Sequence, residues 1–301
     1  MTLLDRLSPR RRLQPRTAVE STRLVKLPIS VLVQTKNEAV GIRACLSALD
    51  AFDEVIVVDS NSQDDTANIA ASMGFPTINF VWDGRYPKKK QWQLDNVPTR
   101  NKWVLFLDAD ETPEPELVQF LAKQQLHLKS TVAAYDVRLA YYFSGQRLRH
   151  GHVVVKRTLL DRTKAQFPVV DDLDIPGMGE LEGHYQPAIN GLVETAAGRL
   201  RHKDLDPVRT WFERHNRYSD WEAELRLKAR ARGVVASSRT PKGQMFDKVP
   251  FKPFMFFVYS YVARRGYLDG RAGFDYAIAL SSYYWQTGLK VREKSREQGR
   301  P

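Results

Sequence analysis

The segment Trp103-Val-Leu-Phe-Leu-Asp108-Ala-Asp110-Glu111 decides the fold prediction, because an unbroken apolar run ends there in a group of carboxylates. Such a run is typical of a strand that is buried on both faces of a parallel sheet. Similar runs precede it over residues 29–34, 54–59 and 77–82, and helical patterns follow these runs over 40–49, 64–73 and 88–96. The alternation predicts an α/β fold with a mostly parallel sheet flanked by helices.

The rest of the chain changes character. A helix is expected with Thr112 as its N-cap and Pro113 as its first residue, running to about Leu126. Strands are expected over 133–141 and 153–157, functional loops over 162–192, and a helix from Asp206 to about Arg232. We therefore expect a basic flexible arm over 1–27, a catalytic domain over 28–205 with halves 28–130 and 131–205, and a helical C-terminal region over 206–301.

Composition excludes several classes of protein. The 301 residues are 43% hydrophobic and 27% charged, which is typical of a globular protein and not of a disordered chain. Cys45, the single cysteine, lies on a helical apolar stripe and is expected to be a core thiol. The net charge of +11 is concentrated near both termini, which favours an anionic membrane or phosphate-bearing substrates over the reading of nucleic-acid sequence. We expect no nucleic-acid partner.

Two C-terminal segments, 249–262 and 272–289, are aromatic and apolar but shorter than a spanning helix. They can be a pair of core helices, or interfacial helices that lie among lipid headgroups with Tyr and Trp at the boundary. The N-terminus has no apolar run of signal-peptide length. We favour the interfacial interpretation, and expect a cytoplasmic protein that is peripheral on the inner face of the cell membrane.

Polar side chains stand where the predicted strands end, and the carboxyl ends of parallel strands form one crevice. Asp108 and Asp110, two residues apart after a strand, can converge on one divalent cation together with phosphate oxygens and water. The alternative is that these acids cap a helix start. Asp59, at the end of an earlier run, can accept hydrogen bonds from a base or ribose, or can belong to a turn before an N-cap.

The loop Thr35-Lys-Asn-Glu38 follows the first predicted strand and opens on the same crevice. It lacks the glycines of the dinucleotide-binding fingerprint and of the phosphate-binding P-loop. This absence argues against nicotinamide-dependent enzymes and P-loop nucleotide hydrolases.

The three motifs at 35–38, 59–66 and 108–111, taken together, resemble the family 2 glycosyltransferases with the GT-A fold. The chain looks most like the bacterial branch that includes lipopolysaccharide-core and exopolysaccharide enzymes. That branch has a lysine-rich segment before the acidic strand end, matched by Pro87-Lys-Lys-Lys90-Gln-Trp92, and a C-terminal signature matched by Gly266-Tyr-Leu-Asp-Gly270.

The resemblance implies roles for individual residues. Asp110, with Asp108, would bind the divalent cation, Mg²⁺ or Mn²⁺. The nucleotide-sugar would be contacted by residues of the three motifs and of the lysine-rich segment: Thr35, Asn37, Glu38, Asp59, Lys90 and Asp108. The catalytic base would come from the second half, with Glu182 first, Glu180 second and Asp172 or its neighbour Asp171 third. His184 and His202 would shape the acceptor pocket or serve the structure.

These expectations amount to an inverting, metal-dependent glycosyltransferase. It would move a sugar from a UDP- or GDP-sugar to a glycan or lipid-linked acceptor in cell-surface polysaccharide synthesis, next to an anionic membrane surface. A nucleotidyltransferase on a similar sheet would use the same carboxylate and cation chemistry. A basic membrane or RNA adaptor without enzymatic activity would explain the net charge but not the acidic strand ends.

Overall fold

The computed structural model describes residues 26–124, 131–172, 179–180, 186–203, 207–228, 233, 245–246 and 249–299. Most of the expected basic arm lies outside these ranges. The same holds for Asp206 and for two residues of the expected acceptor half, Glu182 and His184.

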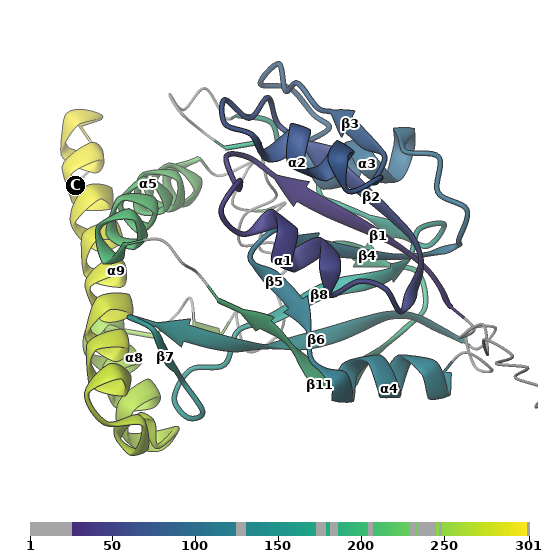
Figure 1. The fold of residues 1–301 in the computed structure, drawn as a ribbon. Helices are drawn as coiled ribbons and strands as arrows, with labels where there is room; N and C mark the ends of the chain where they lie inside the picture. Colours follow the sequence, from purple (N-terminus) through teal and green to yellow (C-terminus); the bar gives the residue numbers. More distant parts are fainter. Residues whose placement is uncertain are drawn as a thin grey trace, which may run out of the picture.

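One sheet organises the molecule (Figure 1). Its strand order is β3 (Thr77–Asn79), β2 (Phe52–Asp59), β1 (Leu27–Thr35), β4 (Trp103–Asp108), β8 (Val155–Asp161), β6 (Val132–Phe143), β11 (Leu192–His202) and β5 (Glu111–Pro113). The first four strands are parallel to one another. β8 runs antiparallel to both of its neighbours, and β11 is parallel to β6 but antiparallel to β5. The short β7 (Gln146–Arg147) pairs with β6, and β9 (Ala165–Gln166) and β10 (Ala188–Ile189) form a separate ribbon.

Helices cover both faces of this sheet. They are α1 (Ile42–Ser47), α2 (Thr66–Ser72), α3 (Lys89–Asn96) and α4 (Pro115–Gln124). Apolar residues of α1, α2 and α4 share one core with alternate residues of the central strands, whereas α3 packs with the other set of strand residues. Central strands buried on both faces explain the unbroken apolar runs of the sequence. The predicted α/β class, with a mostly parallel sheet flanked by helices, is confirmed.

The helix expected to begin at Thr112 and Pro113 was placed too early. Residues Glu111–Pro113 instead form β5, which pairs with the end of β11, and the helix α4 begins at Pro115. Proline fits the first turn of a helix because it needs no backbone N–H there, and this argument fits Pro115 as well as Pro113. The partner strand decides between the two prolines, and it lies far along the chain.

A helical unit follows the sheet. It consists of α5 (Val208–Leu227), α8 (Lys252–Phe257), the π-helical turn η2 (Val258–Ala263), the 3₁₀ turn η3 (Gly266–Asp269) and α9 (Gly270–Glu297). These helices stand at one end of the sheet, beside the tips of β6 and β7 (Figure 1). Phe143 of β6 joins Trp211 of α5 and Tyr276 of α9 in a small aromatic core. None of the described helices is long and apolar enough to cross a membrane.

The signature at 266–270 forms the seam between this unit and the sheet. Asp269 accepts hydrogen bonds from the backbone N–H groups of Arg149, at 2.9 Å, and His150, at 2.8 Å. A Cβ atom on Gly273 would stand 2.0 Å from the carbonyl oxygen of Gly266. Glycine is therefore required at 273 by the close approach of two backbones.

Candidate active site

The register of the parallel strands brings the polar motifs to one edge. Thr35 stands opposite Asp59, and Gln34 stands opposite Asp108. The carboxyl ends of β1, β2 and β4 therefore open on a common crevice, as expected for ligand sites of parallel sheets.

A clasp of hydrogen bonds joins the loops after β1 and β2. The Thr35 hydroxyl donates to Asp59 Oδ1 over 2.6 Å, and the hydroxyl and N–H of Ser62 donate to the same carboxylate over 2.6 and 2.8 Å. Asp59 is buried, with 4% of its surface exposed. Asp59 thus holds both loops in place, and contact with a nucleoside stays a prediction for it.

Two further residues of the first loop take part in the same clasp. The side-chain oxygen of Asn37 accepts the N–H of Gln63 at 2.8 Å, and the N–H of Glu38 donates to the Thr66 hydroxyl at 2.7 Å. Asn37 has a φ of 59°, a left-handed conformation that asparagine tolerates better than most residues. The loop is thus held in a defined shape beside the crevice, and the Glu38 side chain is half-buried there.

The three lysines of the 87–92 segment point to three different partners. Lys88 donates to the carbonyl oxygen of Gly179 at 2.8 Å. Lys89 is 1% exposed and donates to the Ser60 hydroxyl at 2.6 Å, so burial lowers its pKa to about 8 although Glu180 and Asp59 oppose the change. Lys90 acts electrostatically on Asp108 and lowers the pKa of that carboxyl. Lys90 keeps its predicted place near the acidic strand end, and Lys89 is a second cation at the crevice that the sequence did not single out.

The candidates for the catalytic base are spread over the second half. Glu180 reaches the crevice, because its carboxylate lies 3.8 Å from the ammonium of Lys89 and 4.0 Å from that of Lys36. Asp172 lies against the loop after β3, where its N–H donates to the carbonyl oxygen of Gly84 at 3.0 Å. Glu182, the first choice, falls outside the described residues. The choice of base stays a prediction.

A cluster of charges lies under the acidic strand end, with Glu111 buried and Asp108 and Lys156 half-buried. The ammonium of Lys156, from β8, contacts Asp108 Oδ2 at 2.5 Å and Glu111 Oε1 at 2.6 Å. Burial opposes ionisation of all three groups, but Lys156 holds the pKa values of Asp108 and Glu111 below their usual range, and the two carboxylates raise the pKa of Lys156. Asp108 is therefore held as a carboxylate by a lysine of the protein itself.

Asp110 faces a histidine. The pairing of β5 with β11 sets His202 opposite Glu111, and His202 Nδ1 then lies 3.3 Å from Asp110 Oδ1. Burial works against a charged imidazole, but the carboxylates of Asp110 and Glu111 raise the pKa of His202 to about 10. Both facing atoms are buried, and neither makes a well-aligned hydrogen bond within the described part of the chain.

The Asp110–His202 corner has the chemistry that a divalent cation needs. Carboxylate and imidazole groups both bind divalent metals, and His202 would have to give up its proton when the cation enters. Within the described ranges, no three His, Cys, Asp or Glu side chains gather closely enough to hold a metal ion by themselves. Phosphate oxygens of a donor or water would have to complete the coordination shell.

Sequence reasoning missed two functional candidates and placed a third differently. No motif marked either lysine in the sequence: Lys89 is one of three consecutive lysines, and Lys156 lies in an ordinary strand pattern. His202 was expected near an acceptor, whereas the structure sets it beside Asp110. The useful signal for His202 would have been recognition of β11 as a strand, since only its pairing with β5 brings the imidazole to the acidic strand end.

Comparison with known proteins gives the family. Residues 30–179 match the model described as Glycosyl transferase family 2. The chain is 25% identical over 284 residues to the lipopolysaccharide core biosynthesis glycosyltransferase LpsC of Rhizobium meliloti, covering 92% of this chain and 96% of that protein. An uncharacterized glycosyltransferase of Rickettsia prowazekii is 36% identical over 123 residues, 40% of either chain.

Among solved structures, similarity extends to glucosyl-3-phosphoglycerate synthase of Mycobacterium tuberculosis, in a crystal of its complex with Mn²⁺, UDP-glucose and phosphoglyceric acid. The identity is 17%, with 65% of this chain and 79% of that chain covered, and the TM-score is 0.36. The family match and LpsC agree with the resemblance drawn from the motifs, and the matched residues include β1, β2 and β4 with their polar ends. The chain belongs to glycosyl transferase family 2.

Proposed function

We propose that this glycosyltransferase moves a sugar from a nucleotide-sugar, a UDP- or GDP-sugar, to a glycan or lipid-linked acceptor in cell-surface polysaccharide synthesis. Family membership supports the reaction class. The acceptor class is supported by LpsC, a lipopolysaccharide-core enzyme that aligns over nearly the whole of both chains.

The observation that carries the donor site is the Asp110–His202 corner, where two buried ligand atoms face each other 3.3 Å apart without a well-aligned hydrogen bond. We propose that Asp110 and His202 hold Mg²⁺ or Mn²⁺ there. When bound, such a cation would neutralise the diphosphate of the donor and of the departing nucleoside diphosphate.

The remaining roles fall to side chains of the chain itself. The clasp around Asp59 would keep the two nucleoside-facing loops in a fixed shape before the donor arrives. Lys89 and Lys90 would add positive charge near the diphosphate. A carboxylate among Glu182, Glu180 and Asp172 would accept the proton of the attacking hydroxyl in a single displacement, which inverts the anomeric carbon.

The test measures donor binding and turnover in the full chain. A panel of nucleotide-sugars is screened by thermal shift with and without Mn²⁺, because a ligand of the native state raises the melting temperature. The best donor is then given to Asp110→Asn and His202→Asn variants. Both should lose the Mn²⁺-dependent shift, and turnover should fall by on the order of 10³-fold.

Asp53→Asn is the matched control, since Asp53 is exposed at the opposite end of β2 from Asp59. It should behave as the native protein in both assays. Native turnover and a native Mn²⁺-dependent shift in Asp110→Asn would refute the cation site. If no nucleotide-sugar shifts the melting temperature of the native protein with either cation, the donor proposal itself fails.

A further inference from the structure

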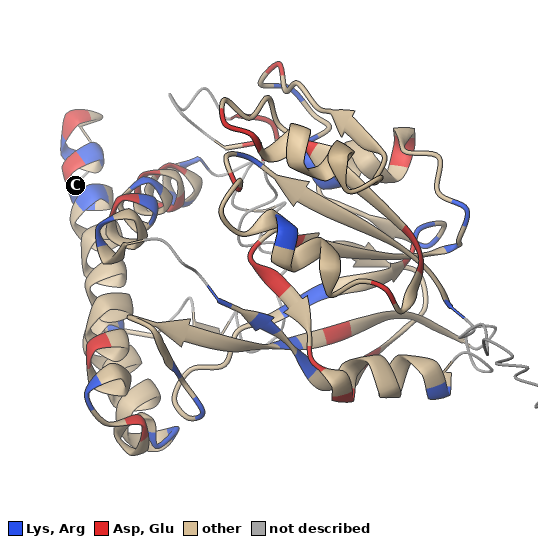
Figure 2. Ribbon diagram, viewed as in Figure 1, with Lys and Arg blue, Asp and Glu red and all other residues tan. Residues whose placement is uncertain are grey.

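Helix α9 carries a row of exposed apolar side chains. Phe274, Ile278, Trp285 and Leu289 recur at spacings of four or seven residues, and between 37% and 55% of each is exposed. At 3.6 residues per turn these positions fall on one side of the helix. Ile278, Trp285 and Leu289 lie in a stretch of α9, from Tyr276 to Leu289, without a charged residue, and Phe274 stands just before it. Figure 2 shows this uncharged middle of α9, with charged residues at both ends of the helix.

The segment before α9 carries a second row. Phe254 of α8 is 66% exposed and Val262 of η2 is 55% exposed, and Phe251 just ahead of them is 83% exposed. Tyr267 and Leu268 of η3 extend the same segment, and about half of each is exposed. Single exposed apolar side chains are common on protein surfaces. A group of large ones exposed together indicates a surface that a membrane or a protein partner covers.

The two rows adjoin at Phe274. Its ring lies 6.0 Å from that of Phe257 in α8 and 5.6 Å from that of Tyr261 in η2, and the Tyr261 ring lies 6.3 Å from that of Tyr267. The exposed residues of α8, η2, η3 and α9 therefore form one surface, which we call the apolar face.

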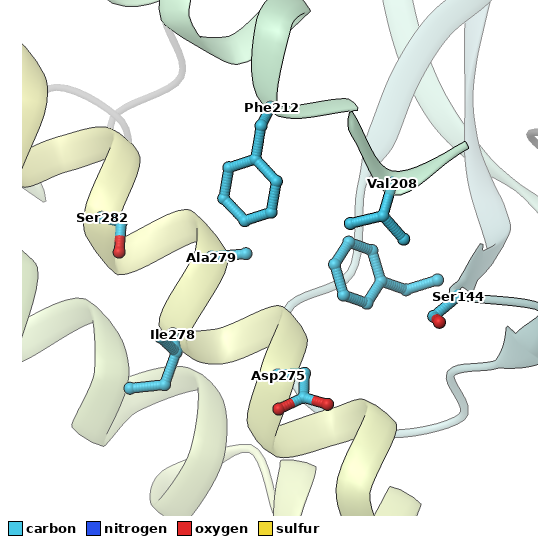
Figure 3. A pocket seen from close by; sticks show the side chains of 8 residues that line it. Ser144, Val208, Phe212, Asp275, Ile278, Ala279 and Ser282 are labelled. Carbon is cyan, nitrogen blue, oxygen red and sulfur yellow. The ribbon is translucent and has the colours of Figure 1, made fainter. Parts of the chain in front are cut away.

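A shallow hollow borders the apolar face (Figure 3). Ile278 of α9 lines it together with Phe212 and Val208 of α5 and Phe143 of β6, and the side chains of Phe212 and Val208 turn toward α9. Its volume is about 280 Å³, and Ser144, Ser282 and Asp275 line it together with the apolar side chains. A carboxylate in a hollow of this size does not suit the diphosphate of a nucleotide-sugar. The hollow is separate from the crevice at Asp110 and extends the apolar face toward α5.

The margin of the apolar face is positively charged. Arg264, Arg265 and Arg271 are exposed around η3, at the junction of the two rows. Residues 249–299 contain eight Lys or Arg against four Asp or Glu. Arg271 pairs with Asp275, and Lys290 and Lys294 pair with Asp220 and Glu224 of α5, so Arg264 and Arg265 carry most of the positive charge of this margin. One of the four acids, Asp269, is turned inward onto the backbone of Arg149 and His150. Tyr, Trp and Phe with a rim of arginines match the boundary between acyl chains and anionic headgroups.

We propose that the apolar face rests in the headgroup layer of an anionic lipid bilayer, with Phe254 and Trp285 among the acyl-chain ends and the arginines against lipid phosphates. Charge complementarity favours this occupant over a second copy of the chain, because two copies would bring the same arginines together. The proposal concerns the C-terminal helices and does not depend on the donor site.

Vesicle co-sedimentation of the full chain tests this. The native protein should sediment with vesicles of phosphatidylglycerol and phosphatidylcholine at low ionic strength, and much less with phosphatidylcholine alone. The double variant Phe254→Ser/Trp285→Ser should partition at least roughly tenfold less. The double variant Arg264→Gln/Arg265→Asn should lose roughly fivefold per charge on anionic vesicles and almost nothing on neutral ones.

Leu192→Ser is the matched control, because Leu192 is 51% exposed at the end of β11 remote from His202. It should bind vesicles like the native protein. The proposal is overturned if the native protein stays in solution with anionic vesicles at low ionic strength, or if the Phe254→Ser/Trp285→Ser variant binds as well as native. It is also overturned if the native chain is a dimer that this variant dissociates.

The donor thermal shift is measured on the same samples and separates the two proposals. It should be equal in the native protein and the Phe254→Ser/Trp285→Ser variant. Loss of vesicle binding with an intact donor shift then bears on the apolar face alone.

Discussion

The strand-end crevice and the seam that joins the C-terminal helices to the sheet are built in opposite ways. In the crevice, Lys156 bridges two carboxylates and His202 faces a third. In the seam, backbones approach closely at Gly266 and Gly273, and aromatic rings of β6, α5 and α9 fill the space beside it. Ion pairs between partly buried side chains stabilise the crevice, whereas close packing of backbones and aromatic rings fixes the C-terminal helices at the seam.

The difference follows from what each region has to do. Binding a phosphate-bearing donor requires charges in fixed places, and such charges are retained although burying them is unfavourable. Fixing a helix against a sheet requires only close packing. Substitutions in the crevice should therefore respond to pH, and those in the seam should respond to side-chain volume.

The largest loss of stability is expected for Lys156→Met. Removal of the ammonium leaves Glu111, which is 1% exposed, and Asp108 without their shared cation. The free energy of unfolding should fall by about 3 kcal/mol at neutral pH, measured by urea denaturation.

The pH dependence of that loss has a definite sign. The pKa of Glu111 is lowered in the native fold from its ordinary 4.5, so its contribution is present above that pH and disappears as the pH falls. The difference between native and Lys156→Met should therefore shrink in acid. Arg271→Met, which breaks an exposed ion pair with Asp275, is the control and should change stability by less than about 0.5 kcal/mol. A pH-independent difference would contradict the ionic account of the cluster.

A smaller loss, about 2 kcal/mol, is expected for Gly273→Ala in the seam, because the added methyl meets the Gly266 carbonyl oxygen. Gly288→Ala on the same helix is the matched control, since its methyl would find only the end of the Arg292 side chain at 3.6 Å. That substitution should raise stability by up to about 1 kcal/mol through helix propensity. Equal effects at both glycines, measured by thermal and urea unfolding, would contradict close packing at the seam.

In the clasp, Thr35→Val removes one hydrogen bond to the buried Asp59 carboxylate while keeping the side-chain shape. Ser62 continues to donate to that carboxylate, so the loss should be limited to about 1.5 kcal/mol. If the clasp shapes the donor loops, the KM for the donor should rise more than kcat falls. A native KM together with lowered stability would restrict the clasp to a structural role.

The smallest effect concerns His152 at the seam. Its backbone N–H donates to the Ser260 hydroxyl. Burial, with help from Arg264, lowers the pKa of His152 from 6.5 to about 4. The unfolded chain then binds the proton more readily, so stability should decline by on the order of 1 kcal/mol as the pH falls from 7 to about 5.5. His152→Gln should remove this part of the slope, as measured by unfolding at several pH values.

Local sequence predicted the first half of the fold well. The apolar runs expected over 29–34 and 54–59 became β1 and β2 with bounds Leu27–Thr35 and Phe52–Asp59, because both faces of these strands are buried. The expected core role of Cys45 is confirmed by its burial on α1, where its thiol faces the carbonyl oxygen of Glu111 in β5. Such patterns depend only on residues that are close to one another in the sequence.

The second half depends on contacts that no local pattern records. The middle of β11, Glu194-Thr-Ala-Ala-Gly-Arg199, has low strand propensity and was not predicted as a strand. Residues 193–195 and 199–202 pair with β6, and residues 200–202 pair with β5, so the segment runs as one strand with an irregularity in its middle. The acidic strand end was predicted, but its lysine and imidazole partners come from β8 and β11, so the sequence could name the carboxylates and not the cations.

Tyr141 gives this arrangement a practical consequence. Its ring stacks on His202 at 4.9 Å and lies 5.2 Å from Tyr276 of α9, and its hydroxyl accepts a hydrogen bond from Trp211 of α5. Tyr141 thus connects the imidazole to α5 and α9, two helices that lie outside residues 30–179. A fragment limited to residues 30–179 would keep Asp110 but would lose His202 and the two helices that position it. Inactivity of such a fragment would therefore say nothing about the intact enzyme.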